Sequence, residues 1–212
     1  MKTCYMCDSP GTTDEHVPPR CVFPRGGAHR KNLITVPSCE IHNSAKSKCD
    51  EYLRHVLICS PNVNELALQV ADEGLVPSFE RRPHMVETFL HEARPVRLGP
   101  VSTLAFSVNL ERFEVAIANI VRGLHFHQTG EKLRCNIVVI SSAFCFPDLQ
   151  EGPYLGLVTR IEQQAPGAYT GSNPRAFCYE LQGGGGARGF CRMRFYEGQP
   201  IYAVWDEITL AP

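Results

Sequence analysis

Two pairs of candidate metal ligands lie near the N-terminus, and they constrain the fold more than any other feature of this chain. The first pair is Cys4-x-x-Cys7 and the second is Cys39-x-x-His42. Zinc prefers tetrahedral sites of thiolate and imidazole ligands, and a two-residue spacer lets one turn present both ligands of a pair. The 31 residues between Cys7 and Cys39 must therefore fold back. We predict one structural zinc ion bound by Cys4, Cys7, Cys39 and His42.

The local signals around these ligands predict two short strands followed by a helix. The first strand runs from Thr13 to Val17, and the second runs from Leu33 to Val36. Ser38 is in position to cap a helix from about Glu40 to Cys59, which Pro61 ends. A module of residues 1–58 is too small to bury a sufficient core alone, so we expect the metal to contribute much of its folding free energy.

Residues 59–212 have ordinary amphipathic patterns and are predicted to form a second, mixed α+β domain with a mostly antiparallel sheet. Residues 60–95 are predicted to be helical over Val63 to Ala71 and Met85 to Ala93, with a break at Gly74 and Pro77. Residues 101–210 are predicted to hold the sheet and a long helix. The helix spans Phe113 to Leu124, and the strands are expected over Leu104–Val108, Cys135–Ile140, Phe177–Leu181, Phe190–Phe195 and Ile201–Trp205, with the glycines at 183–186 joining two of them as a hairpin.

Composition narrows the class of protein. The 212 residues carry a net charge of -1, so bulk charge alone does not indicate a nucleic-acid binder. The N-terminus has no apolar signal-peptide core, and no apolar run is long enough to span a bilayer. Ten cysteines without a disulfide-type spacing favour a reducing compartment, with Cys59, Cys135, Cys145, Cys178 and Cys191 expected as buried thiols. We therefore expect a cytoplasmic protein with no membrane contact.

The sequence around the ligands resembles a known family. The strings DEHVPPRCVFP, NLITVPSCEIHNSAKS and CDEYLR resemble the HNH endonucleases, and in particular members with Glu-His-x-x-Pro and Cys-x-x-Cys-Asn elements. The resemblance covers roughly residues 4–54 and does not extend to the remaining chain. It implies a ββα-metal, treble-clef-like hairpin plus helix, and an activity on DNA. His42 stands where these members usually have cysteine, and zinc accepts either ligand.

The resemblance also implies roles for individual residues. His16 matches the general base, and Glu15 matches the acidic ligand of a catalytic divalent ion. Asn32 matches the asparagine that fixes the loop geometry, and Asn43 matches the last metal-binding position. Glu15 is one methylene longer than the more common aspartate. Strand alternation would place Asp14 beside His16, so Asp14 is an alternative ligand.

The chemistry of these residue types agrees with hydrolysis of a phosphodiester bond. A histidine with an ordinary pKa of ~6.5 can accept a proton at neutral pH. Mg²⁺ or Mn²⁺ takes oxygen ligands, which one carboxylate and one amide can supply. Basic side chains nearby are candidates for gripping the phosphate backbone, and they are Lys46, one helical turn beyond Asn43, with Arg20, Arg25, Arg30 and Lys31 around the loop between the strands.

We therefore predict a metal-dependent HNH endonuclease that cleaves DNA. The competing hypotheses are a non-catalytic zinc module that binds nucleic acid or protein, and an RNase. The second domain is expected to position the substrate, a partner protein or a second protomer.

Overall fold

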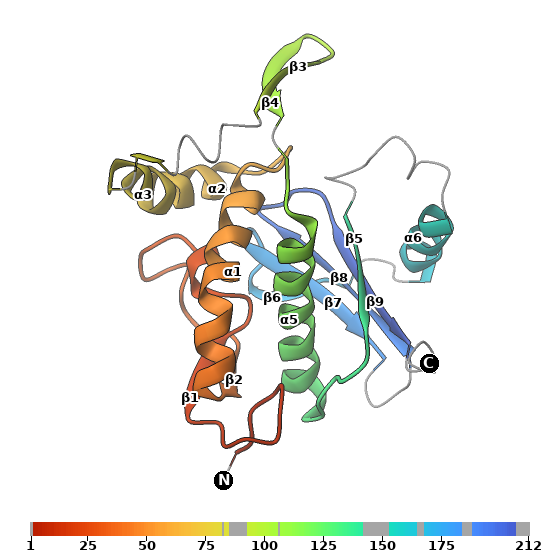
Figure 1. Cartoon of the computed structure of the whole chain (residues 1–212). Helices are drawn as coiled ribbons and strands as arrows, with labels where there is room; N and C mark the ends of the chain where they lie inside the picture. The colour runs from red at the N-terminus through yellow and green to blue at the C-terminus, as the bar shows by residue number, and fades with distance from the viewer. Residues whose placement is uncertain are drawn as a thin grey trace.

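The computed structural model describes residues 2–81, 83–84, 93–105, 107–141, 153–164, 168–183 and 188–206, and these form a mixed α+β architecture (Figure 1). The largest sheet has five antiparallel strands, and two smaller sheets have two strands each. The predicted α+β class and the antiparallel character of the sheet are confirmed. Among the helices in these ranges, none combines the length and the apolar character needed to cross a membrane.

The N-terminal hairpin consists of β1 (Thr13–His16) and β2 (Thr35–Ser38), which pair in antiparallel register. The position of β1 agrees with the prediction, whereas β2 begins two residues later than predicted. Asn32 adopts a left-handed φ of 53°, a conformation that asparagine tolerates better than most residues, so the chain is still turning there. The pairing then starts with a hydrogen bond of 2.9 Å from the Val17 amide to the Ile34 carbonyl.

Helix α1 (Glu40–Ile58) follows the hairpin at the predicted place. The prediction that Ser38 caps this helix is wrong. Cys39 occupies the N-cap position, and no side chain caps the helix there. Ser38 is the last residue of β2, so it lies one position too early, and its hydroxyl instead donates to the Cys39 carbonyl at 3.4 Å.

A second helical region runs through α2 (Glu65–Val70), the π-helical segment η2 (Ala71–Leu75) and α3 (Val76–Arg81) without interruption. It confirms the predicted helix near residues 63–71, but the predicted break at Gly74 and Pro77 is wrong. The wider turn of a π-helix absorbs an irregularity inside a helix, and Pro77 is the second residue after this segment. Most of the helix predicted from Met85 to Ala93 lies outside the described residues.

Helix α5 (Leu110–Thr129) is the long amphipathic helix, and it extends beyond its predicted range at both ends. The Asn109 side chain caps it by accepting from the Arg112 amide at 2.9 Å, and Gly130 ends it with a left-handed φ of 75°. The helix lies beside α1 and in front of the five-stranded sheet, against which it packs (Figure 1). It therefore connects the hairpin region with the sheet.

The five-stranded sheet has the order β5-β9-β8-β7-β6. Its strands are β5 (Ile137–Ser141), β6 (Thr170–Asn173), β7 (Phe177–Gln182), β8 (Arg188–Phe195) and β9 (Ile201–Asp206). Four of them confirm predicted strands, and β7 and β8 pair as the predicted hairpin. The sequence patterns did not predict β6 or helix α6 (Pro153–Gln164).

A separate hairpin of β3 (Arg94–Leu98) and β4 (Val101–Ala105) projects away from the rest of the chain (Figure 1). The predicted strand at residues 104–108 therefore overlaps only the last two residues of β4. The described cysteines are all free. Cys135, Cys178 and Cys191 are buried as predicted, whereas Cys59 is exposed because it is the C-cap of α1; Cys145 lies outside the described residues.

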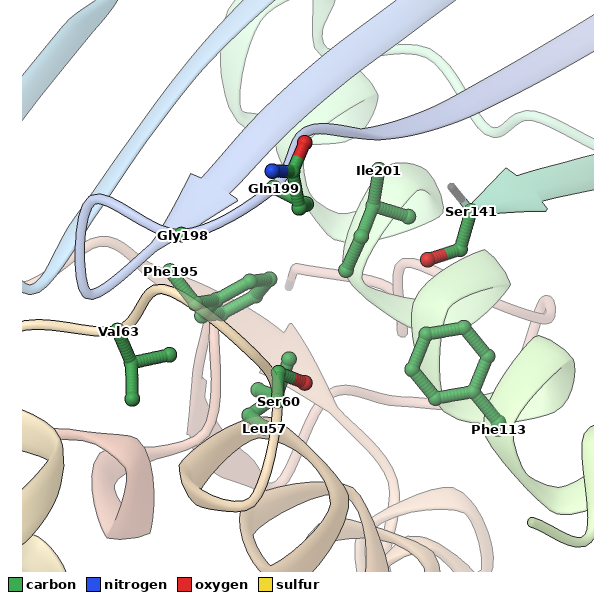
Figure 2. A pocket seen from close by; sticks show the side chains of 9 residues that line it. All are labelled: Leu57, Ser60, Val63, Phe113, Ser141, Phe195, Gly198, Gln199 and Ile201. Atoms are coloured by element: carbon green, nitrogen blue, oxygen red, sulfur yellow. The ribbon is translucent and has the colours of Figure 1, made fainter. Parts of the chain in front are cut away.

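One hydrophobic core includes residues from both sides of the predicted boundary at residue 58. A Cβ atom added to Gly123 of α5 would lie 2.6 Å from Val17, so α5 approaches the end of β1 closely. Figure 2 shows a second junction, where Leu57 of α1, Phe113 of α5 and Ile201 of β9 surround a gap of about 10 Å³. This gap has room for one water molecule at most. The division into residues 1–58 and 59–212 stays a prediction.

Candidate functional site

The structure brings the four predicted metal ligands together. One ligand atom from each of Cys4, Cys7, Cys39 and His42 lies within 4.8 Å of all the others. The His42 Nδ1 atom is 3.5 Å from Cys4 Sγ and 3.2 Å from Cys39 Sγ, and the sulfurs of Cys7 and Cys39 are 3.9 Å apart. A tetrahedral site with zinc–sulfur bonds of ~2.3 Å has sulfur–sulfur edges of ~3.8 Å. The donor set and its spacing therefore fit a zinc ion.

Backbone contacts fix the loop that carries the first ligand pair. The Cys4 amide donates to the Ser9 carbonyl at 2.9 Å, and the Gly11 amide donates to the Lys2 carbonyl at 2.9 Å. A Cβ atom at Gly11 would lie 2.7 Å from the Pro37 side chain, so this close approach to β2 requires glycine. The Tyr5 amide also bonds to the Pro37 carbonyl at 2.9 Å. The loop is thus attached to the hairpin, and the cluster joins both to α1.

The Cys7 thiol has a lowered pKa, which favours metal binding. Hydrogen bonds from the Ser9 side chain and backbone lower the pKa of Cys7 to about 6, against a smaller opposing effect of burial. The thiolate is the form of cysteine that binds metals. The lowered pKa therefore favours the metal-binding form of Cys7.

The two faces of β1 carry different residues. Glu15 is buried and points toward α1, whereas Asp14 is exposed and His16 is half-buried on the other face. Strand alternation explains this separation, because neighbouring side chains of a strand point to opposite sides. Asp14 therefore shares the face of His16, as the alternation argument indicated, and Glu15 does not.

Glu15 belongs to a buried polar cluster at the interface of β1 and α1. Its Oε1 atom accepts a hydrogen bond from the Tyr5 hydroxyl at 3.0 Å and forms an ion pair with the Lys46 ammonium group. Its Oε2 atom is buried and has no hydrogen-bond partner. Lys46 is also 3.8 Å from the Asp50 carboxylate, whose pKa is raised to about 6, mainly by burial. Lys46 is thus a buried counter-ion rather than a surface contact for phosphate.

The two predicted asparagines occupy different places. Asn43 lies in the first turn of α1, and its amide donates to the Thr13 hydroxyl at 3.2 Å. Because Thr13 and Glu15 share one face of β1, Asn43 and Glu15 both face the interface between β1 and α1. Asn32 is exposed in the loop before β2, at the left-handed turn described above.

His16 has a basic neighbourhood. Burial lowers the pKa of His16, and the positive charges of Arg20 and Arg30 lower it further. The half-buried Arg30 side chain donates two hydrogen bonds to the Phe23 carbonyl, at 2.8 and 3.3 Å. Arg20 is exposed at the start of the 3-10 helix η1 (Arg20–Val22). Asp14 and Glu15 oppose this shift, but the net direction lowers the pKa and therefore favours the neutral form of His16.

Sequence reasoning missed three residues of this region, namely Tyr5, Asp50 and Arg54. Tyr5 lies inside the first ligand pair, where a buried aromatic hydroxyl requires a polar partner. Asp50 and Arg54 follow Lys46 at intervals of four residues, so all three lie along one side of α1. This i, i+4 spacing was a signal that could have identified them.

Comparisons with known proteins give no further information about the site. The chain matches no family model, and the comparisons with curated proteins and with solved structures also find no match. The functional argument therefore rests on the residues and their geometry.

Proposed function

We propose that the protein is a metal-dependent endonuclease of the HNH type that hydrolyses phosphodiester bonds of DNA. The observation that carries this proposal is the Cys4, Cys7, Cys39 and His42 cluster, which joins a β-hairpin to a helix. His16 lies on the first strand of that hairpin, and Asn43 directly follows the last ligand on the helix. This order of elements and residues is what the sequence resemblance implies.

His16 is the proposed general base. In its neutral form it accepts a proton from a water molecule, whose oxygen then attacks the phosphorus atom. The bond between phosphorus and the 3′ oxygen breaks, and that oxygen takes up a proton from solvent. The products are a 5′-phosphate and a 3′-hydroxyl. The lowered pKa of His16 supports this role, because an imidazolium ion cannot accept the proton.

Glu15 and Asn43 would hold the catalytic Mg²⁺ or Mn²⁺ ion. Both face the same interface, and the buried Oε2 atom of Glu15 has no partner, so one carboxylate oxygen remains for a ligand bond. When bound, such an ion supplies positive charge for the developing phosphorane and the leaving oxygen. Asp14, on the face of His16, remains the alternative ligand.

The ion pair between Lys46 and Glu15 favours a second candidate function. Lys46 already neutralises the carboxylate, and a divalent ion would have to bind beside a buried ammonium group. If Lys46 keeps this place, the same fold is a non-catalytic zinc module that binds nucleic acid or protein. The arginines near His16 would then serve binding alone.

A cleavage assay with matched histidine variants separates the two functions. The purified full-length chain is incubated with plasmid DNA, DNA oligonucleotides and RNA in the presence of Mg²⁺ or Mn²⁺. His16→Ala should lower single-turnover DNA cleavage by at least ~100-fold, the lower end for loss of a general base. The control is His127→Ala, because His127 is an exposed histidine on α5.

The outcomes lead to different conclusions. A selective loss with His16→Ala and full activity with His127→Ala supports the nuclease. Equal cleavage by His16→Ala and the wild type refutes the assignment of the base. Absence of cleavage by the zinc-loaded wild type on all substrates supports the non-catalytic module, and cleavage of RNA alone identifies an RNase.

A further inference from the structure

A pocket of about 220 Å³ lies where the loop after β1 faces the C-terminal half of α1 and the π-helical segment η2. Arg20, Arg25 and Arg30 reach it from the loop, Arg54 reaches it from α1, and Glu73 and Gly74 contribute from η2. The pocket is therefore large enough for a small anionic group together with part of the molecule that carries it.

The charge of the pocket is strongly positive. Four arginines and one glutamate give a formal charge of 4 − 1 = +3. The Glu73 carboxylate accepts hydrogen bonds from two neutral donors, the Arg25 backbone amide and the Gln69 side-chain amide, the latter at 2.9 Å. Within the described part of the chain, the side chains of Arg20, Arg25 and Arg30 form no ion pair. The positive charge is thus mostly uncompensated by the protein.

The arginines are close enough to repel one another. Burial lowers the pKa of Arg30, and the charges of Arg20 and Arg25 lower it further, with Glu73 acting in the opposite direction. Such an arrangement is unfavourable in the free protein, and an anion that binds between the guanidinium groups relieves the repulsion. The geometry therefore favours an anionic ligand over a neutral one.

Arg54 forms a fixed wall of the pocket. Its side chain is only 11% exposed, and its buried Nε atom has no hydrogen-bond partner. A Cβ atom at Gly74 would lie 2.8 Å from Arg54 Nη1, so the guanidinium group packs directly against the backbone of η2. Its nearest carboxylate is that of Glu51, at 3.7 Å and about half-exposed. Arg54 Nη2 also lies 3.0 Å from His55 Nε2, so the guanidinium group is held in place at the wall of the pocket.

We propose that this pocket binds a phosphate group, and that the phosphate belongs to the DNA strand whose neighbouring linkage is presented to His16. Guanidinium groups match phosphate oxygens in a bidentate geometry, and a charge of +3 suits a phosphate with its adjoining linkage. His16 is the last residue of β1, and the loop that leaves it brings Arg20, four residues further on, to the wall of the pocket. The positive charges of Arg20 and Arg30, which both line the pocket, also lower the pKa of His16. The second part of the proposal rests on the proposed nuclease function.

The test measures binding without cleavage. Fluorescence anisotropy follows a labelled DNA duplex with the full-length His16→Ala protein, zinc-loaded and without added Mg²⁺ or Mn²⁺, over a range of salt concentrations. Arg25→Gln and the double variant Arg20→Gln/Arg25→Gln change exposed side chains of the pocket, so the fold should be retained. Arg188→Gln is the matched control, because Arg188 is an exposed arginine on β8.

Arg25→Gln should weaken DNA binding by about tenfold, the effect of a lost charge-assisted hydrogen bond. It should also reduce the slope of log K against log salt concentration by about one, and the double variant should reduce it by about two. Arg188→Gln should change neither quantity. Unchanged binding and slope in the pocket variants would overturn the proposal.

The source of the phosphate is tested with inorganic phosphate and a deoxymononucleotide as competitors. DNA that binds far more tightly than either competitor supports a phosphate of the strand. A mononucleotide that binds as tightly as DNA in an Arg25-dependent manner overturns that part of the proposal. The nuclease proposal can fail separately. If DNA binding depends on Arg25 but the wild-type protein does not cleave DNA, the phosphate pocket is supported and the nuclease function is refuted.

Discussion

Replacing Lys46 tests the buried cluster between β1 and α1 most directly. The side chains of Lys46 and Glu15 are 3% and 6% exposed, so Lys46→Met leaves a carboxylate buried without its counter-ion. Removal of one partner from a buried ion pair costs ~3–5 kcal/mol. For a chain of this size, ~2–4 °C per kcal/mol converts this to a fall in melting temperature of about 6–20 °C.

The effect of Lys46→Met should depend on pH because of Asp50. Burial raises the pKa of Asp50 from 3.8 to about 6, so its protonated form stabilises the folded state. That stabilisation is fully present below pH 3.8, the ordinary pKa of the group, and it is lost as the pH rises through the folded-state pKa of about 6. Lys46 lowers the pKa of Asp50, so its loss raises this pKa further. The destabilisation by Lys46→Met should therefore be larger at pH 8 than near pH 6.

The assay is urea unfolding of zinc-loaded protein, followed by far-ultraviolet circular dichroism at pH 6 and pH 8. Lys31→Met is the control, because Lys31 is an exposed lysine of the loop before β2. The double variant Glu15→Gln/Lys46→Met should lose less stability than the sum of the single changes, since both charges of the pair are then absent. A loss below ~1 kcal/mol for Lys46→Met at pH 8 would refute the buried ion pair.

Three further predictions concern the metals and the packing. Protein purified without added metal should contain about one zinc per chain by elemental analysis. Cys39→Ser should lose the zinc and unfold at a lower urea concentration. The control Cys59→Ser, outside the cluster, should keep the zinc. Asn43→Ala should reduce cleavage, and excess Mn²⁺ should partly restore it because a ligand rather than the base is missing; no rescue would argue against Asn43 as a ligand. Gly123→Ala should cost ~1–3 kcal/mol in unfolding free energy by overpacking against Val17, and a combined Val17→Ala change should recover part of this loss.

The sequence alone determined the local parts of this protein. The spacing of Cys4, Cys7, Cys39 and His42 predicted a cluster that the structure forms, since a two-residue spacer fixes how close two ligands lie. The start of α1, the position of β1 and the strand patterns of β7, β8 and β9 were likewise predictable. These features depend on periodicity and turn chemistry within short segments, which the sequence records directly.

Only the tertiary structure decided which partners these residues meet. Alternation separated Glu15 from His16 on β1, but the sequence did not reveal that Lys46 and Tyr5 would cover the carboxylate. Arg54 of α1 lines the same pocket as Arg20, Arg25 and Arg30 because its guanidinium group packs against Gly74 of η2. The reason is physical: spacing along one element fixes which side chains share a face, whereas the element that covers that face is chosen by packing between segments distant in sequence.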